Sequence, residues 1–426
     1  MMKSSILAIV LASGLASAAP ARAQARVELV PSVSLSSTYD NNLFATENAS
    51  RDEMILVTPS LEAYYQSPSV TLQSLYSFDA QRAVGHPVLN MLDARRHGLI
   101  DTAIKVTPQF RFSFDGRYDL SQFPNELNFE TGVLLGRQRS TRWQITPAVE
   151  YQVRPRTILN VQYDLTNEAM LGYINGQMQV IRAGFERKQS PLVTWGVRYL
   201  GRRFANGAGS AFPLPAFAGM NVIVIPESSF TVAPAPVLDL GGPTSQSSHA
   251  VLGDVTWALG PETSLMVQGG PRISSYGSRM PEVLTTFAKQ TRLTKIGLDY
   301  WQGETIVLGI RGPVQLQSST AKTAWPIRRT VEIGAHAGVF HIETLQKAAA
   351  RVFHGEMVGS WSPGGPYTLA ASYGVDFQKG DVRSPLLSEK QVVRHVFLVR
   401  LTVAPRLSGS IKPKDPNDPT SKGVSR

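Results

Sequence analysis

The sequence predicts an all-β fold: a transmembrane antiparallel up-and-down β-barrel of about 16 strands, with 14 to 18 allowed. Three observations predict it. Apolar and polar side chains alternate along most of the chain, most strand patterns are 10 to 14 residues long, and the links between them alternate between short and long. Strands in soluble sheets cluster near five or six residues, whereas a tilted membrane strand needs roughly 9 to 11. The strand lengths therefore favour a membrane barrel.

The stretch QFRFSFDGRYDL, residues 109–120, shows the alternation clearly. Phe110, Phe112, Phe114 and Tyr118 fall on one face of a strand, and charged residues fall on the other. A soluble sandwich would place the aromatic face inward, as in a soluble adhesin. In a membrane barrel the aromatic face touches lipid and the charged face lines the interior, and we expect this second arrangement because the pattern is long and recurs.

The predicted strands number seventeen, and the even strand number usual in single-chain barrels brings the expectation to sixteen. Pro59 and Pro147 lie inside two of the patterns and predict a bulge or an edge, because proline donates no ladder hydrogen bond. The patterns begin near residues 27, 54, 69, 95, 109, 140, 157, 177, 192, 249, 262, 292, 304, 329, 350, 367 and 391.

The links place short turns at one end of the barrel and long loops at the other, as in outer-membrane barrels. The short links are QSPS, VTPQ, RPR, QSP, GPE and QGE, and the long links include TYDNNLFATENASRDE, QRAVGHPVLNMLD, SQFPNELNFETG and SYGSRMPEVLTTFAKQ. The longest is the apolar segment 203–248, whose only charges after Arg203 are Glu227 and Asp239. Two hypotheses fit it: a loop folded into the lumen as a constriction or gate, and an extracellular cap or extra hairpin.

The two ends of the chain predict export and a disordered tail. Lys3, the apolar run at 6–16 and the sequence Ala21-Arg22-Ala23 indicate a cleavable signal peptide over residues 1–23. Its removal lowers the net charge from +10 to +8, because it takes away Lys3 and Arg22 and no acid. The barrel is expected over 24–407 and a disordered polar tail over 408–426. Outer-membrane barrels resemble one another in ending on an aromatic residue, and the polar tail departs from that pattern. The expected location is the outer membrane of a Gram-negative bacterium.

Several function classes have little support in the composition. The chain has no cysteine, so neither disulfides nor a thiolate metal site is expected, and no Lys/Arg run indicates nucleic acid. No HExxH or GxSxG motif occurs, and we predict no cofactor, no metal and no catalytic site. His354 and Glu356 share one face of a predicted strand, and Glu332 and His336 share one face of its neighbour. This pattern supports a less favoured hypothesis, an outer-membrane enzyme that modifies lipid or glycan.

One short motif carries a resemblance to a known family. Residues 39–44 read YDNNLF. The motif resembles the signature of a family of outer-membrane β-barrel porins that in Gram-negative bacteria accompany exopolysaccharide or capsule export systems. The resemblance implies a channel for solute or polymer, in contact with outer-membrane lipid and with envelope export machinery. From the residues alone, Asp40, Asn41 and Asn42 predict a turn at the strand end, with a calcium or glycan site as the alternative.

The polar face of the strands would line the lumen, and its charges suggest what could pass. Arginines on neighbouring strands would attract polysaccharide or small anionic or hydroxylated solutes; alternatively, they pair with acids and brace the wall. A structural barrel with a plugged lumen that anchors envelope partners is the alternative function. The candidate lumen residues are Arg111, Arg117, Arg142, Arg182, Arg198, Arg202, Arg272, Arg311, Arg394, Arg400, Asp115, Asp119, Glu150, Asp164, Asp254 and Asp376.

Overall fold

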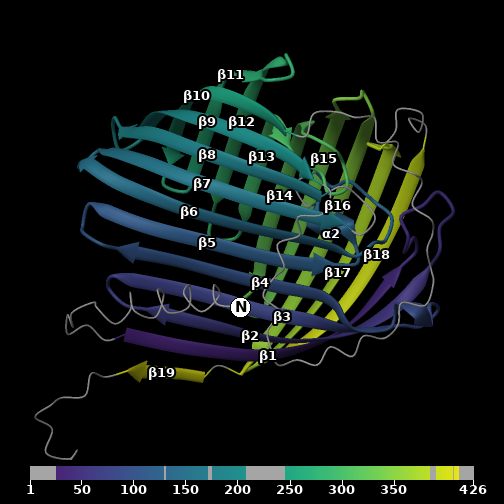
Figure 1. Ribbon diagram of the computed structural model, residues 1–426. Helices are drawn as coiled ribbons and strands as arrows, with labels where there is room; N and C mark the ends of the chain where they lie inside the picture. Colours follow the sequence, from purple (N-terminus) through teal and green to yellow (C-terminus); the bar gives the residue numbers. More distant parts are fainter. Residues whose placement is uncertain are drawn as a thin grey trace, which may run out of the picture.

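The computed structural model describes residues 25–128, 131–170, 175–207, 245–383, 390–405 and 407–411, and within them the chain forms one antiparallel sheet closed into a barrel (Figure 1). The barrel strands are β1 (Ala25–Asp40), β2 (Asp52–Gln66), β3 (Val70–Ala83), β4 (Met91–Lys105), β5 (Phe110–Ser121), β6 (Ser140–Arg154), β7 (Thr157–Met170), β8 (Asn175–Lys188), β9 (Val193–Gly207), β10 (Ser245–Gly260), β11 (Thr263–Ser274), β12 (Arg279–Gln290), β13 (Lys295–Thr305), β14 (Val314–Arg328), β15 (Val331–Thr344), β16 (Ala349–Gly364), β17 (Tyr367–Gly380) and β18 (Gln391–Val403). Two short helices, η1 (Pro87–Leu89) and α2 (Pro124–Leu127), lie in the links. The predicted all-β barrel is confirmed.

The first and last barrel strands close the sheet. Val33 of β1 pairs with Pro59 of β2 on one side and with Val403 of β18 on the other, and Figure 1 shows the yellow β18 beside the purple β1. Closure removes the unpaired strand edges on which other chains would assemble. A short strand, β19 (Leu407–Ile411), continues the same register along β1. Residues 408–411, which the sequence placed in the polar tail, are therefore part of a strand.

Within the described residues the barrel has eighteen strands, not counting β19, which is the upper limit of the expected 14 to 18 and more than the favoured sixteen. The missed strand is β12, which lies inside SYGSRMPEVLTTFAKQ, a segment that was expected to be a long loop. The actual link between β11 and β12 is the four-residue turn 275–278. The expectation that every link at this end is long hid the alternation of Val283, Thr285 and Phe287, which all lie on one side of β12.

A second correction concerns the strand expected to begin near 304. The supposed turn QGE lies inside β13, and the next strand, β14, begins only at Val314. Residues 306–313 between them form a loop, in which Ile306, Val307 and Leu308 are buried. Loops are usually polar, so the apolar run in this loop was expected to form a strand. The loop can be apolar because it is buried.

Both prolines lie where the ladder is interrupted. β2 pairs with β3 at Val57 and again at Ser60, which leaves Pro59 and its neighbour without a partner on that side. The pairing of β6 with β7 likewise skips the two residues from Thr146 to Pro147. The register is the same before and after each gap, so the missing proline donor costs local hydrogen bonds without shifting the strands.

The outer surface is apolar over most strands. Val33 of β1, Val161 of β7 and Met357 of β16 expose 50%, 49% and 59% of their surface. Monomeric soluble proteins rarely expose contiguous apolar patches larger than a few hundred Å², so this surface suits lipid. The predicted signal peptide, residues 1–23, lies outside the described residues.

Among the described residues, no helix is both long enough and apolar enough to cross a membrane.

Candidate channel interior

The polar parity of the strands faces the interior. In β9, Arg202 is buried while Tyr199 is exposed. Nη1 of Arg202 donates to Oε2 of Glu282 in β12 at 2.7 Å, although two strands, β10 and β11, separate β9 from β12. A direct bond between strands that are not neighbours must cross the concave side of the sheet. Arg202 and Glu282 therefore point into the barrel.

The link between β5 and β6, of which the structure describes residues 122–128 and 131–139, crosses the interior. Nitrogen of Leu134 donates to Oε1 of Gln378 in β17 at 2.7 Å, and nitrogen of Leu308, in the β13–β14 loop, donates to Oδ1 of Asn128 at 3.1 Å. Gly132 has a φ of +64° and lies so close to β15 that an added Cβ would stand 3.1 Å from the Phe340 ring. Since β15 and β17 lie far around the barrel from β5 and β6, this link, hereafter the inner loop, spans the lumen.

A constriction formed by the segment 203–248 was one of the two hypotheses drawn from the sequence, and an extracellular cap or extra hairpin was the other. Residues 208–244 of this segment lie outside the described residues. The inner loop was expected to be only an external link, although it carries the apolar run Val133-Leu134-Leu135. That run is the signal that sequence reasoning missed, because a freely solvated loop would not place three large apolar residues together.

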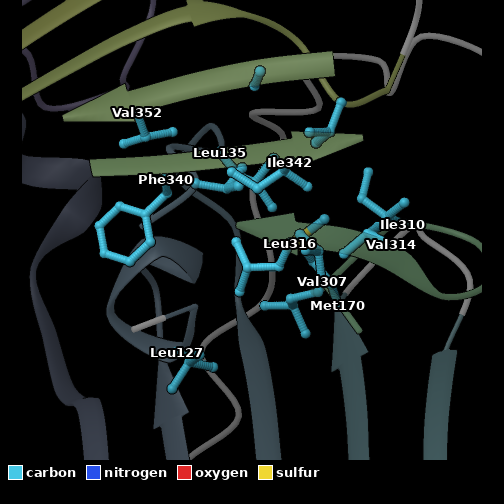
Figure 2. Packing of buried hydrophobic residues seen from close by; sticks show 14 residues of the cluster. Leu127, Leu135, Met170, Val307, Ile310, Val314, Leu316, Phe340, Ile342 and Val352 are labelled. Atoms are coloured by element: carbon cyan, nitrogen blue, oxygen red, sulfur yellow. The ribbon is translucent and has the colours of Figure 1, made fainter. Parts of the chain in front are cut away.

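An apolar cluster holds the inner loop against the far wall, as Figure 2 shows. Leu127 and Leu135 from the inner loop and Val307 from the β13–β14 loop meet wall residues that face inward. Burying one such side chain is worth roughly 1.5–3 kcal/mol, so several together fix the loop firmly. The cluster consists of Leu127, Val133, Leu135, Met170, Val307, Leu308, Ile310, Val314, Leu316, Phe340, Ile342, Ala350, Val352 and Val382, with Trp301 packed against it.

The root of the inner loop is held by a buried aromatic ring surrounded by arginines. The centroid of the Phe123 ring lies 4.2 Å from the guanidinium carbon of Arg137, 5.4 Å from that of Arg95 and 5.5 Å from that of Arg394. Cations over an aromatic face attract its quadrupole. Burial, together with repulsion from Arg95, lowers the pKa of Arg137 to about 10, so this guanidinium remains charged at neutral pH.

Beside the inner loop lies a cavity of about 400 Å³, lined by polar and apolar side chains of β6 to β13. Arg142, Arg182, Arg198 and Arg202 contribute to its lining, together with three acids, Asp164, Glu282 and Glu304. Most of these charges are paired across neighbouring strands. Nη1 of Arg142 lies 3.4 Å from Oε1 of Glu168, Nη2 of Arg198 lies 3.0 Å from Oε1 of Glu186, and Arg182 pairs with Asp164.

One donor in the lining of this cavity has no partner. The side chain of Gln268 in β11 is buried, and its Nε2 makes no hydrogen bond within the part of the chain that the structure describes. A buried donor without a partner costs roughly 1–3 kcal/mol. A bound water or a hydroxyl or carboxylate oxygen of a solute would offset this cost.

The predicted lumen residues fall into groups. Arg142, Arg202, Arg272, Arg394, Asp164, Asp254 and Asp376 are buried. Arg111 and Glu150, 3.7 Å apart, and Arg400 are exposed, whereas Arg117, Arg182, Arg198, Asp115 and Asp119 are partly buried.

Two of the predicted lumen residues, Arg311 and Arg272, do not simply line a polar wall. Arg311 lies in the β13–β14 loop instead of a strand, which corrects its expected position on the wall. Arg272, with no exposed side-chain surface, pairs with Glu304 at 3.3 Å, and Oγ of Ser274 donates to Glu304 at 2.7 Å. These pairs show that many of the interior charges brace the wall.

The histidine and glutamate candidates for an enzyme lie on the same inner wall. Nδ1 of His354 lies 2.6 Å from Oδ1 of Asp376, and the His336 ring lies 5.5 Å from the His354 ring. Glu356 pairs in register with His336, and Glu332 lies opposite Ser360. Within the described ranges, no three His, Asp or Glu side chains are arranged to hold a metal ion.

The YDNNLF motif forms a structural turn at the end of β1. Nitrogen of Asn42 donates to Oδ1 of Asp40 at 2.9 Å, which closes an Asx turn. Nδ2 of Asn42 donates to the Val393 carbonyl at 2.9 Å, and Oδ1 of Asn41 accepts from the nitrogen of His395 at 2.6 Å. The polar side chains of the motif thus bind β18 across the closing seam.

No family model and no curated protein matches the chain. Among solved structures, it is similar to OccAB4 of Acinetobacter baumannii, with 8% identity, 89% of this chain and 98% of that chain covered, and a TM-score of 0.43. It is also similar to OccK11 of Pseudomonas aeruginosa, with 10% identity, 90% and 96% covered and a TM-score of 0.42. For the outer membrane protein opdK of the same organism, the identity is 11%, the coverage 89% and 99%, and the TM-score 0.41.

Proposed function

We propose that this protein is an outer-membrane channel whose pore is narrowed by the inner loop. The observation that carries the proposal is the course of this loop. It crosses a closed barrel and leaves the arginine-lined cavity beside it instead of filling the whole section. A barrel of eighteen strands is in the size range that leaves an aqueous channel. The apolar outer surface and the predicted signal peptide support a location in the outer membrane.

The proposed solutes are small anions and hydroxylated molecules. The cavity offers guanidinium groups and the unpartnered amide of Gln268, which suit carboxylate and hydroxyl oxygens. The acids among the lining residues nearly balance the arginines, so only weak anion selectivity is expected. A wide polymer would require the inner loop to move.

An exopolysaccharide export context remains part of the proposal, and the YDNNLF resemblance is its only support. In this context, outer-membrane lipid surrounds the barrel, and envelope export machinery would meet it at the short-turn end. The bonds made by Asp40, Asn41 and Asn42 give the motif a structural role, so the export context requires a test of its own. Deletion of the gene should lower the amount of exported polysaccharide.

The channel proposal is tested by solute uptake. The mature protein, folded in detergent, is reconstituted into liposomes, and swelling is followed in neutral and anionic sugars of graded size. We expect uptake of monosaccharides and a sharp loss with increasing size. If a barrel with an intact heat-modifiable mobility admits no solute of any size, the channel proposal fails.

A plugged structural barrel is the second candidate, and the apolar cluster around the inner loop favours it. It predicts no uptake by the wild type and a protein partner that co-purifies with the barrel. The enzyme hypothesis rests on His354, whose Nδ1 lies 2.6 Å from Oδ1 of Asp376. It predicts that His354→Ala abolishes a lipid or glycan modification while solute uptake is unchanged. A soluble adhesin would be recovered outside the membrane fraction.

A further inference from the structure

A row of hydrogen-bond donors runs across five neighbouring strands on the outside of the barrel. In register, Gln317 of β14 pairs with His341 of β15, His341 with Arg351 of β16, Arg351 with Lys379 of β17, and Lys379 with Gln391 of β18. These strands run from green to yellow in Figure 1. The five residues therefore stand at one height on the barrel, and we call them the outer donor row.

The outer donor row faces away from the interior. Side chains alternate along a strand, and the neighbours Phe340, Val352 and Gln378 are buried inside. Arg351 and Lys379 are exposed. The outer donor row lies at the long-loop end of these strands.

An apolar row lies directly beneath the donors. On each strand, the next residue of the outer face toward the short-turn end is apolar. These residues, Val339, Phe353, Phe377 and Val393, pair with one another in register, and all four are exposed. Below them, the outer face of β16 remains apolar at Met357 and down to Trp361. The donors therefore mark the upper border of the band that suits acyl chains.

The charge around the outer donor row is positive. Arg351 has no ion-pair partner among the residues that the structure describes. Glu343 lies two residues beyond His341 on the same face of β15, and its Oε1 lies 2.7 Å from Nζ of Lys347. Glu47 accepts a hydrogen bond from the Gln391 nitrogen at 3.3 Å. Arg351 and Lys379, which pair in register, thus bring two positive charges to the outer donor row, and Gln317, His341 and Gln391 add polar hydrogen-bonding groups.

We propose that the outer donor row binds the phosphate of a lipid headgroup in the leaflet at the long-loop end. A guanidinium binds phosphate through two parallel hydrogen bonds, and an ammonium adds a point charge. The apolar row beneath places acyl chains directly under the headgroup, which a soluble phosphate compound would not need. The inference rests on the membrane insertion of the proposed function, but not on conduction.

The test compares lipid retention by native mass spectrometry. The detergent-solubilised mature protein is titrated with dipalmitoyl phosphatidic acid or with phosphatidylcholine carrying the same chains. The wild type should retain phosphatidic acid about thirtyfold more tightly, as expected for two basic residues near a charged lipid surface. The variant R351Q/K379Q should lose that preference. The matched control R187Q/K289Q, which removes two exposed charges from the outer face at the short-turn end, should keep it.

The outcomes separate this inference from the channel proposal. Equal retention of both lipids by the wild type, or an unchanged preference in R351Q/K379Q, would overturn the inference. Full competition by millimolar inorganic phosphate would assign the row to soluble phosphate and would also overturn it. A barrel with the lipid preference but without solute uptake would contradict only the channel proposal. Heat-modifiable mobility of each variant shows that it has folded.

Discussion

Asp40 in the first strand and Arg394 in the last form a buried pair across the closing seam. Oδ2 of Asp40 accepts hydrogen bonds from Nη2 of Arg394 at 2.7 Å and from Nε at 2.9 Å. The same guanidinium packs near the ring of Phe123, at the root of the inner loop. A single arginine therefore links the closure of the barrel to the element that narrows it.

Arg394→Gln should destabilise the barrel strongly. It would leave the buried Asp40 carboxylate without its charged partner, and breaking a buried pair in this way costs about 3–5 kcal/mol. The free energy of unfolding in urea, measured in lipid vesicles, checks the effect. The control Arg400→Gln removes an exposed arginine from the same face of β18 and should change stability by less than about 0.5 kcal/mol. Similar losses in both variants would argue against a special role of the seam pair.

Phe123→Leu should loosen the inner loop without unfolding the barrel. Leucine keeps an apolar side chain but offers no ring to Arg95, Arg137 and Arg394, and each cation–π contact is worth about 0.5–2 kcal/mol. We expect faster amide hydrogen exchange in residues 122–139 and larger fluctuations of the single-channel current. Phe78→Leu, which changes a ring on the outer face of β3, is the control. Unchanged exchange in the Phe123 variant would show that the ring does not anchor the loop.

Asp381, in the β17–β18 loop, should contribute a stability term that is lost in acid. Burial disfavours its charged carboxylate, but hydrogen bonds and charge from Arg383, together with the charge of Lys390, prevail and lower its pKa to about 2, from an ordinary 3.8. Because the folded pKa is depressed, this contribution is complete above about pH 4 and disappears as the pH falls toward 2.

Asp381→Asn tests this pH dependence. At pH 6 the variant should be less stable than the wild type by about 2 kcal/mol, and the gap should close below pH 4. Urea unfolding at several pH values measures it. A difference that stays constant between pH 6 and pH 2.5 would contradict the assignment.

The cavity arginines should set the ion selectivity of the pore. Arg182→Gln combined with Arg198→Gln removes two positive charges and leaves Asp164 and Glu186 without these partners. The reversal potential in a salt gradient should shift toward cation selectivity. Arg187→Gln, on the outer face of the same strand β8, is the matched control. An unchanged potential in the double variant, or an equal shift in the control, would exclude these arginines from the conduction path.

The barrel could be predicted because its signal is local. Alternation at Phe112, Phe114 and Tyr118 repeats every two residues, and the backbone of a strand fixes that period. The turn at Asp40 to Asn42 was also local, since Asx side chains bond to their own backbone. The strand number was harder to predict, because the short turn before β12 departed from the usual alternation of links.

The inner loop could not be predicted in the same way, because its partners are distant in the chain. Leu134 bonds to Gln378, 244 residues away, and no periodicity reports such a contact. The apolar residues 306–308 were expected to lie in a strand. Contact with the inner loop explains how Val307 and Leu308 can be buried outside a strand, and the sequence pattern does not report that contact. Long-range contacts of this kind decide the candidate site.

The central claim, that the inner loop narrows a conducting barrel, is tested most directly by single-channel conductance in planar bilayers. The wild type is compared with a variant in which two glycines replace residues 129–136. We predict discrete, small conductance steps for the wild type and steps several times larger for the shortened loop, because the lumen would then be open across its section. Equal conductance in both proteins, or none in either once folding is verified, would contradict the account.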